Sequence, residues 1–206
     1  MKRLFHALAC VMLGVSGAGE AQNGLPDGQA ASTPTRMVQL SKVIFDPEIS
    51  KVDQHVRAGT ICIMSGRPLD FGSERTADYE RFERLFSTAM NEQHFNVLAK
   101  SSNLFEGEGS DAKADFLIGA TFRPRSVDIC DSVSGQKGTI AISVEWQIYD
   151  RRKQQIVETI TTEGSGLVPK FQRDGIRAMI DHAFSASLAA LINRGILQKH
   201  LGEPAS

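Results

Sequence analysis

Hydrophobic and polar residues alternate over residues 138–150. The large apolar residues all fall at even positions, and they are Ile140, Ile142, Val144, Trp146 and Ile148. Successive side chains of a strand point to opposite faces, so this pattern predicts a long antiparallel strand with one buried face and one solvent-exposed face. The buried face needs neighbouring strands and a covering layer of helices, which places Trp146 in the core beneath them.

The neighbours follow from the segments on either side of this strand. Residues 116–122 alternate, but the apolar residues after Pro124 have the opposite parity, which predicts a bulge at Arg123–Pro124. Residues 156–162 predict a third antiparallel strand. Gly164-Ser165-Gly166 predicts the turn that ends this meander.

The N-terminal half predicts less regular structure. Residues 37–45 and 95–100 predict strands, and the β-branched run at 59–66 predicts a buried strand. Residues 49–56 predict a short helical piece. Residues 101–113 contain glycines and acidic side chains and predict a mobile loop.

Two segments have the spacing of three and four residues that is typical of amphipathic helices. They span residues 73–93 and 174–195, and their apolar positions include Phe82, Phe86 and Met90 in the first and Ile180, Phe184 and Leu188 in the second. The sequence therefore predicts an α+β fold, with an antiparallel-rich mixed sheet of about four to six strands and two amphipathic helices packed on one face.

The N-terminus predicts export. Residues 1–21 have Lys2 and Arg3, an apolar run and then small residues, as a signal peptide does. Small residues before Cys10 also suggest a lipid-modified cysteine, but the chain stays apolar after it, so lipoprotein anchoring at Cys10 is not favoured. We predict a signal peptide at 1–21, a flexible linker at 22–36, a single α+β domain at 37–195, a C-terminal tail at 196–206 and a periplasmic location.

Composition narrows the classes of function. The 206 residues have a formal net charge of −1, so the chain lacks the basic field that recruits nucleic acid, and no nucleic-acid partner is expected.

Two cysteines survive the predicted cleavage. Cys62 and Cys130 lie in an oxidising compartment, where a pair is most simply a disulfide; two free buried thiols are the alternative. A bridge would close a loop of about 67 residues, which the chain-entropy model values at about 4 kcal/mol.

No constellation of residues predicts catalysis. His55, His94, His182 and His200 have the positions of surface or capping residues, and Ser165 lacks the Gly-x-Ser-x-Gly elbow of serine hydrolases. No Cys-x-x-Cys or His-x-x-x-His spacing points to a metal. We therefore predict no catalytic, cofactor-binding or metal-binding residue, and no cofactor.

Three stretches carry a resemblance to a known family: residues 114–120, residues 138–150, and a Thr-rich strand that ends at 161–164. Over residues 58–193 the chain resembles a proteobacterial exported α/β module of poorly defined function, which is found alone or before a trypsin-like serine protease domain. Its order of elements is also similar to the TolB N-terminal domain, the curli secretion-channel subunit and penicillin-binding-protein activator lipoproteins. These resemblances imply a binding role and supply no catalytic residue.

We therefore expect a non-enzymatic exported cell-envelope module that engages a protein partner, through an exposed sheet edge or the loop at 101–113. An outer-membrane association is a further expectation. Membership of, or an accessory role in, an envelope hydrolase system is one alternative, and carriage of a lipid or other apolar ligand is another. The sequence does not specify the partner or the oligomeric state.

Overall fold

The computed structural model describes residues 36–46, 52–69, 71, 79–98 and 114–202. All of them belong to one compact unit, Thr33–Ser206. The predicted signal peptide, nearly all of the predicted linker and the predicted loop at 101–113 lie outside the described residues.

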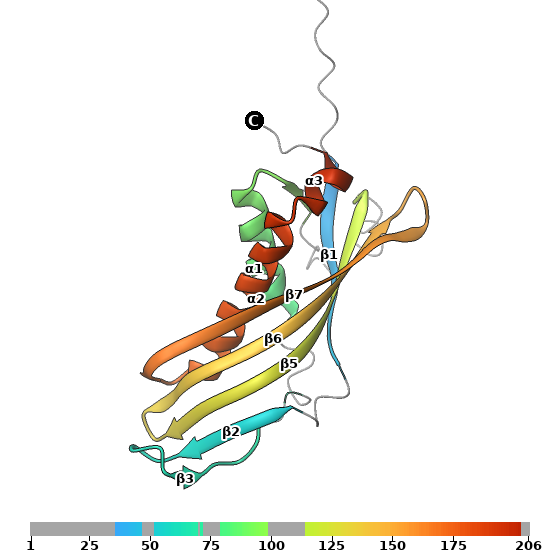
Figure 1. The fold of residues 1–206 in the computed structure, drawn as a ribbon. Coiled ribbons are helices and arrows are strands. Elements are labelled where there is room, and N and C mark those ends of the chain that lie inside the picture. The colour runs from blue at the N-terminus through green and yellow to red at the C-terminus, as the bar shows by residue number, and fades with distance from the viewer. Residues whose placement is uncertain (1–35, 47–51, 70, 72–78, 99–113, 203–206) are drawn as a thin grey trace, which may run out of the picture. The chain divides into compact units, whose positions relative to one another are not determined.

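The described residues form one sheet and three helices (Figure 1). The strands are β1 (Met37–Phe45), β2 (Asp53–Ala58), β3 (Met64–Ser65), β4 (Asn96–Val97), β5 (Phe116–Ser132), β6 (Gly135–Asp150) and β7 (Gln155–Gln172). The helices are α1 (Tyr79–Glu92), α2 (Gly175–Asn193) and α3 (Ile196–Leu201).

The predicted meander of three long antiparallel strands is confirmed. β6 pairs with β5 on one side and with β7 on the other, so that Trp146 lies opposite Ala120 and Ile160. The register of β5 shifts between Pro124 and Ser126, which confirms the predicted bulge. This shift returns the apolar residues of the second half of β5 to the buried face.

The other edge of β5 pairs with two strands in succession. β1 lies parallel to the first half of β5 and β2 lies parallel to the second half. The prediction of a helical piece at 49–56 is wrong for its described part, because β2 begins at Asp53. Val56 of β2 lies opposite the buried Ile129, and this pairing with a distant segment decides its conformation.

The prediction of a buried strand at 59–66 is also wrong. Residues 59–62 form a turn, and only Met64–Ser65 pair, as β3 against the end of β2. Gly59 has φ +88 and Cys62 has φ +57, both outside the extended region. Ile61 and Ile63 are consequently 73% and 76% exposed.

The fold is mixed α+β, as predicted in its coarser form, but the sheet has seven strands rather than four to six. Three strand pairs are parallel and three are antiparallel, so the antiparallel-rich description fits only in part. The parallel pairs come from β1, β2 and β4, which contact strands distant in sequence.

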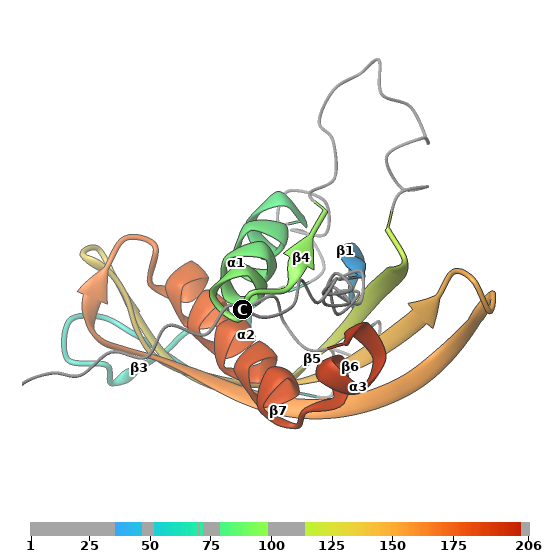
Figure 2. The same cartoon turned by 90° about the horizontal axis from the view of Figure 1, so that it is seen from above.

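The helices α1 and α2 lie on the same, concave side of the sheet (Figure 2). Between the layers, the ring of Phe184 lies 4.7 Å from the ring of Phe82 and 5.5 Å from Trp146. The Trp146 indole N–H donates to Thr162 Oγ1 over 2.8 Å, and Thr162 Oγ1 lies 2.6 Å from Ser187 Oγ. Trp146 is fully buried, which confirms its predicted place in the core.

Gly164 and Gly166 do not form the predicted turn, because β7 continues through them to Gln172. They lie directly beneath α2. A Cβ atom at Gly164 would be 2.0 Å from the carbonyl oxygen of Ala183, and one at Gly166 would be 1.8 Å from that of Met179. The two glycines therefore permit the close approach of helix to strand.

The ordered chain extends past residue 195, where the tail was expected to begin. α3 buries Leu197 and Leu201 in the hydrophobic core. The guanidinium of Arg36 donates to the backbone oxygen of His200 over 2.9 Å, so the first and last described segments meet.

By length and composition α2 is the one described helix that could cross a membrane, but half of it is buried in this domain.

Candidate functional site

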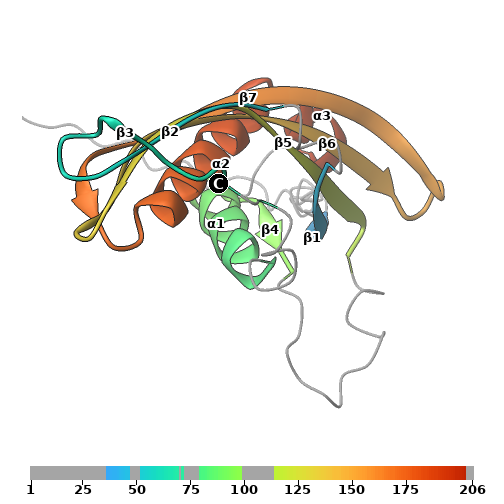
Figure 3. The same ribbon diagram turned by 90° about the horizontal axis from the view of Figure 1, so that it is seen from below.

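The face of the sheet that carries no helix, termed the open face, follows from the alternation in β6. The even positions of β6 point towards the helices, so Lys137, Thr139 and Glu145 point the other way. Figure 3 shows the helices gathered on the opposite, concave side. Polar side chains of β2, β5, β6 and β7 therefore share one accessible surface.

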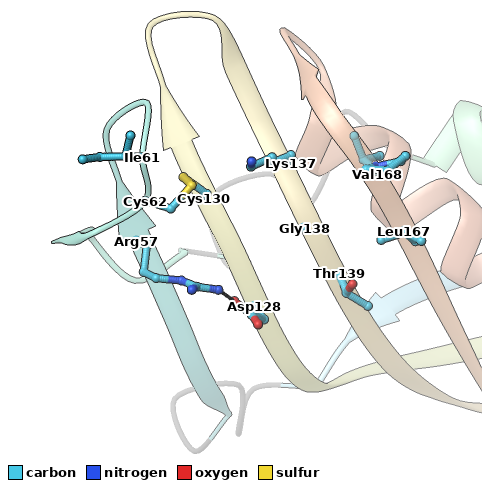
Figure 4. A pocket seen from close by; sticks show the side chains of 11 residues that line it. Arg57, Ile61, Cys62, Asp128, Cys130, Lys137, Gly138, Thr139, Leu167 and Val168 are labelled. Atoms are coloured by element: carbon cyan, nitrogen blue, oxygen red, sulfur yellow. Dashed lines mark hydrogen bonds and ion pairs between the residues drawn. A yellow bond between two sulfur atoms is a disulfide. The ribbon is translucent and has the colours of Figure 1, made fainter.

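A shallow hollow of about 440 Å³ lies on the open face where β2, β5, β6 and β7 run side by side (Figure 4). We call it the open-face hollow, and its lining includes Arg57, Ile61, Asp128, Lys137, Thr139 and Leu167. The guanidinium of Arg57 points towards Asp128 and forms an ion pair with it. Lys137 Nζ lies 4.5 Å from the centre of the Phe171 ring. The hollow thus combines mixed charge with the aliphatic side chains of Ile61 and Leu167.

A disulfide borders the open-face hollow. The structure contains the predicted Cys62–Cys130 bridge, with the two Cα atoms 5.5 Å apart. The backbone N–H of Gly59 also donates to the carbonyl oxygen of Asp131 over 2.8 Å. Together they hold the 59–62 turn against the end of β5, and this turn carries Ile61 to the edge of the hollow.

A second charged group lies further along the open face. Arg123 Nε donates to Asp46 Oδ2 over 2.6 Å, and Arg123 Nη1 donates to Glu145 Oε2 over 3.1 Å. The hydrogen bond to Asp46, above all, raises the pKa of Arg123 despite its partial burial. This cluster ties the chain after β1 to β5 and β6, and its charges are paired.

The outer edge of β7 is the second accessible feature. In the described part of the chain, β7 pairs with β6 alone. Two side chains of the C-terminal region reach its outer carbonyl groups: Arg194 Nη1 donates to Thr161 O over 3.0 Å, and His182 Nδ1 lies 3.3 Å from Leu167 O.

The direction of the remaining backbone groups follows from these two contacts. Alternate residues of an antiparallel strand direct their N–H and C=O groups to opposite sides, and the β6–β7 register is regular from Thr161 to Leu167. Glu163 and Ser165 therefore direct theirs away from β6, as Thr161 and Leu167 do. Pro169 shares this parity, so its missing N–H falls on the outer edge, where proline is tolerated.

Among the residues that the structure describes, no histidine is hydrogen-bonded to a nucleophile. His200 Nε2 lies 3.3 Å from Glu158 Oε2, His55 is exposed beside Asp53, and His182 contacts a backbone carbonyl. His94 has φ +60 in the turn after α1. Within the described ranges, no group of three or more His, Cys, Asp or Glu side chains has the arrangement of a metal site.

Reasoning from sequence located the disulfide but not the surface around it. The exposure of Ile61 and the position of β7 at the edge of the sheet both depend on which strands pair. Neither feature produces a recognisable pattern in the sequence nearby. The parity of Pro169 within the Thr-rich strand was the one signal that could have marked β7 as an edge strand.

Several bacterial proteins of known structure have a remote similarity to this chain. One is a Xanthomonas campestris protein of the family DUF330 (11% identity, 80% of this chain and 85% of that chain covered, TM-score 0.45). A second is a hypothetical protein from Chlamydia trachomatis (13% identity, 83% and 98% covered, TM-score 0.40). A third is the lipoprotein GNA1162 from Neisseria meningitidis (11% identity, 77% and 97% covered, TM-score 0.29).

These TM-scores lie below 0.5, so the similarities carry no argument about function. No family model matches the chain, and no curated protein matches it. None of the three structures is described as a serine protease or a TolB domain. The resemblance to the protease-associated module therefore stays a prediction.

Proposed function

We propose that this protein is a non-enzymatic module of the bacterial cell envelope that binds an extended segment of a protein partner along the outer edge of β7. The observation that carries the proposal is the outer edge of this 18-residue strand, with which no other strand among the described residues pairs. Edge backbone groups bind a partner strand through main-chain hydrogen bonds and need no special side chains.

Small side chains beside this edge suit the addition of a strand. The flank of α2 above this edge exposes small side chains, Ala186 and Ala189, between the two residues that reach the strand, His182 and Arg194. These two cap the carbonyls of Leu167 and Thr161 from within the chain. A bound segment would take over such contacts and would add pairs at Glu163 and Ser165.

Leu167 connects the edge to the open-face hollow. Its backbone lies on the outer edge, and its side chain lines the hollow and is 60% exposed. A partner that pairs with β7 could therefore also contact the hollow, where side chains rather than backbone groups would provide specificity.

The predicted export is supported by the Cys62–Cys130 bridge, because disulfides persist in oxidising compartments such as the periplasm. The two alternative functions have less support. A hydrolase requires a nucleophile and a base in contact, and the described histidines lack such a partner. An apolar-ligand carrier requires space between sheet and helices, where Phe82, Trp146 and Phe184 pack together.

The test is a pull-down from cell-envelope extract with the exported protein and the variant Ser165→Pro as baits. Proline removes the outward N–H of Ser165 and leaves the hydrogen bonds between β6 and β7 in place. The preceding Gly164 tolerates the restriction that proline imposes on its neighbour. We expect a specific protein that the wild type recovers and Ser165→Pro loses.

The matched control is Ser165→Ala, which keeps the N–H and should recover the same protein. Urea unfolding of both variants verifies that they are folded. Equal recovery by Ser165→Pro and Ser165→Ala, or no specific protein with the wild type, would overturn strand addition at β7.

A further inference from the structure

One end of the domain carries exposed aliphatic side chains on adjacent turns. The turns are residues 59–62, 133–134 and 173–174, and we call these turns, together with Ile63 and Met64, the three-turn end. Gly59 bonds to Asp131 across the first two turns, and the backbone of Gly135 contacts Gln172 at the third. Figures 1 and 3 show the β2–β3, β5–β6 and β7–α2 connections side by side.

Four exposed aliphatic side chains belong to this region. Ile61, Ile63, Met64 and Val133 are 73%, 76%, 59% and 103% exposed. Isolated exposed apolar residues are common, but a group of four at one end of a domain marks an interaction surface. They come from two separate segments, residues 61–64 and the 133–134 turn, so no single local sequence pattern accounts for the group.

The polypeptide here is held in place. The Cys62–Cys130 disulfide and the Gly59–Asp131 hydrogen bond fix the first turn to the end of β5. Ile61 and Ile63, which flank the bridged Cys62, therefore cannot fold back to cover themselves. Because the surface is already formed, its binding would require little ordering of the chain.

Basic residues lie close to the three turns in the sequence. Arg57, Lys137, Lys170 and Arg173 flank the three turns, together with Asp128, Asp131 and Asp174. This region has one more basic than acidic residue, whereas the whole chain has a net charge of −1. Arg57 is paired with Asp128, and both Lys170 and Arg173 are exposed.

We propose that the three-turn end inserts these aliphatic side chains into the headgroup region of a lipid bilayer that contains anionic lipid. Exposed aliphatic side chains with basic residues nearby match a surface that is apolar inside and negatively charged outside. The projecting side chains need no recess of matching shape in a fluid bilayer. The polar backbone of the turns stays at headgroup depth, where it remains hydrated.

The test places a fluorescent reporter on the surface itself. In Val133→Trp the new indole is exposed, whereas the natural Trp146 is fully buried and contributes a constant background. We expect its emission to shift to the blue with vesicles of phosphatidylethanolamine and phosphatidylglycerol (3:1), and less with phosphatidylcholine vesicles. Adding Ile61→Ser and Ile63→Ser to Val133→Trp should weaken this vesicle binding about tenfold.

The matched control is Ile156→Trp, because Ile156 is 51% exposed beside the β6–β7 turn at the opposite end of the sheet. Its emission should not change. An equal shift at both positions, no shift at Val133→Trp, or a shift that appears only with vesicle-free envelope protein would overturn the proposal. The vesicle test contains no partner protein, and the pull-down compares Ser165→Pro with Ser165→Ala, which share the same three-turn end, so either proposal can fail without the other.

Discussion

Asp150 is a buried carboxylate at the turn between β6 and β7. Its Oδ1 accepts the backbone N–H groups of Arg152 over 2.9 Å and Lys153 over 3.1 Å. Burial by itself would raise the pKa of Asp150, but these two hydrogen bonds and the charge of Lys153 outweigh it. The pKa therefore lies below its ordinary value of 3.8.

This shift predicts a dependence of stability on pH. A carboxyl whose folded-state pKa is depressed stabilises the fold above its unfolded pKa and loses this contribution as pH falls through the folded pKa. Asp150→Asn keeps an acceptor oxygen for the turn but cannot ionise. In urea unfolding we expect the wild type to exceed Asp150→Asn in stability at pH 6, and the difference to shrink below pH 4. A difference that stays constant from pH 6 to pH 3 would contradict this account.

Trp146 illustrates how far a single residue could be predicted. Alternation alone assigned it to the buried face, and that assignment is confirmed. Its hydrogen-bond partner Thr162 lies on a neighbouring strand, and Ser187 lies on α2. These partners depend on the β6–β7 register and on where α2 crosses the sheet, so no pattern near Trp146 could reveal them.

At the scale of elements, the contact between β7 and α2 depends on two glycines. We predict that Gly166→Ala lowers the free energy of unfolding by about 3 kcal/mol or more, because the added methyl group would collide with the backbone of α2. Denaturant unfolding measures this change.

Gly119→Ala is the matched control, since a Cβ atom there meets nothing within 4 Å. It should leave stability unchanged or raise it slightly, as replacing glycine in a strand commonly does. If the two variants unfold alike, close packing at Gly166 is not what limits this contact.

Long elements were predictable because each buries a continuous stripe. The meander, α1 and α2 all show such stripes, and each is present. β2 and β3 are short and pair at the periphery of the sheet. Their few apolar residues form no continuous stripe, so the predictions of a helical piece at 49–56 and of a buried strand at 59–66 were wrong for the described residues. The sequence predicted a turn at Gly164 and Gly166 because glycine favours turns. Close contact between a helix and a strand also requires glycine, so the two cases look alike in the sequence.

At the scale of the whole molecule, the disulfide joins the 59–62 turn to the strand that organises the sheet. We predict that Cys62→Ser, Cys130→Ser and the double variant each lose about 4 kcal/mol of stability, by the chain-entropy estimate for a loop of this length. Urea unfolding should give this loss for all three, and a reductant should reproduce it in the wild type.

A reductant should have no further effect on the three variants. Intact mass after alkylation, with and without prior reduction, reports the bridge directly. Two alkylated cysteines at positions 62 and 130 without reduction would contradict it.

The meeting of Arg36 with His200 has a practical consequence. The β5 strand runs from that region to the three-turn end, a distance of about 50 Å for 17 residues. An affinity tag or fluorescent protein joined directly after residue 202 would therefore lie far from the three-turn end. Coupling the protein to a biosensor chip through such a tag would leave that end facing the solution.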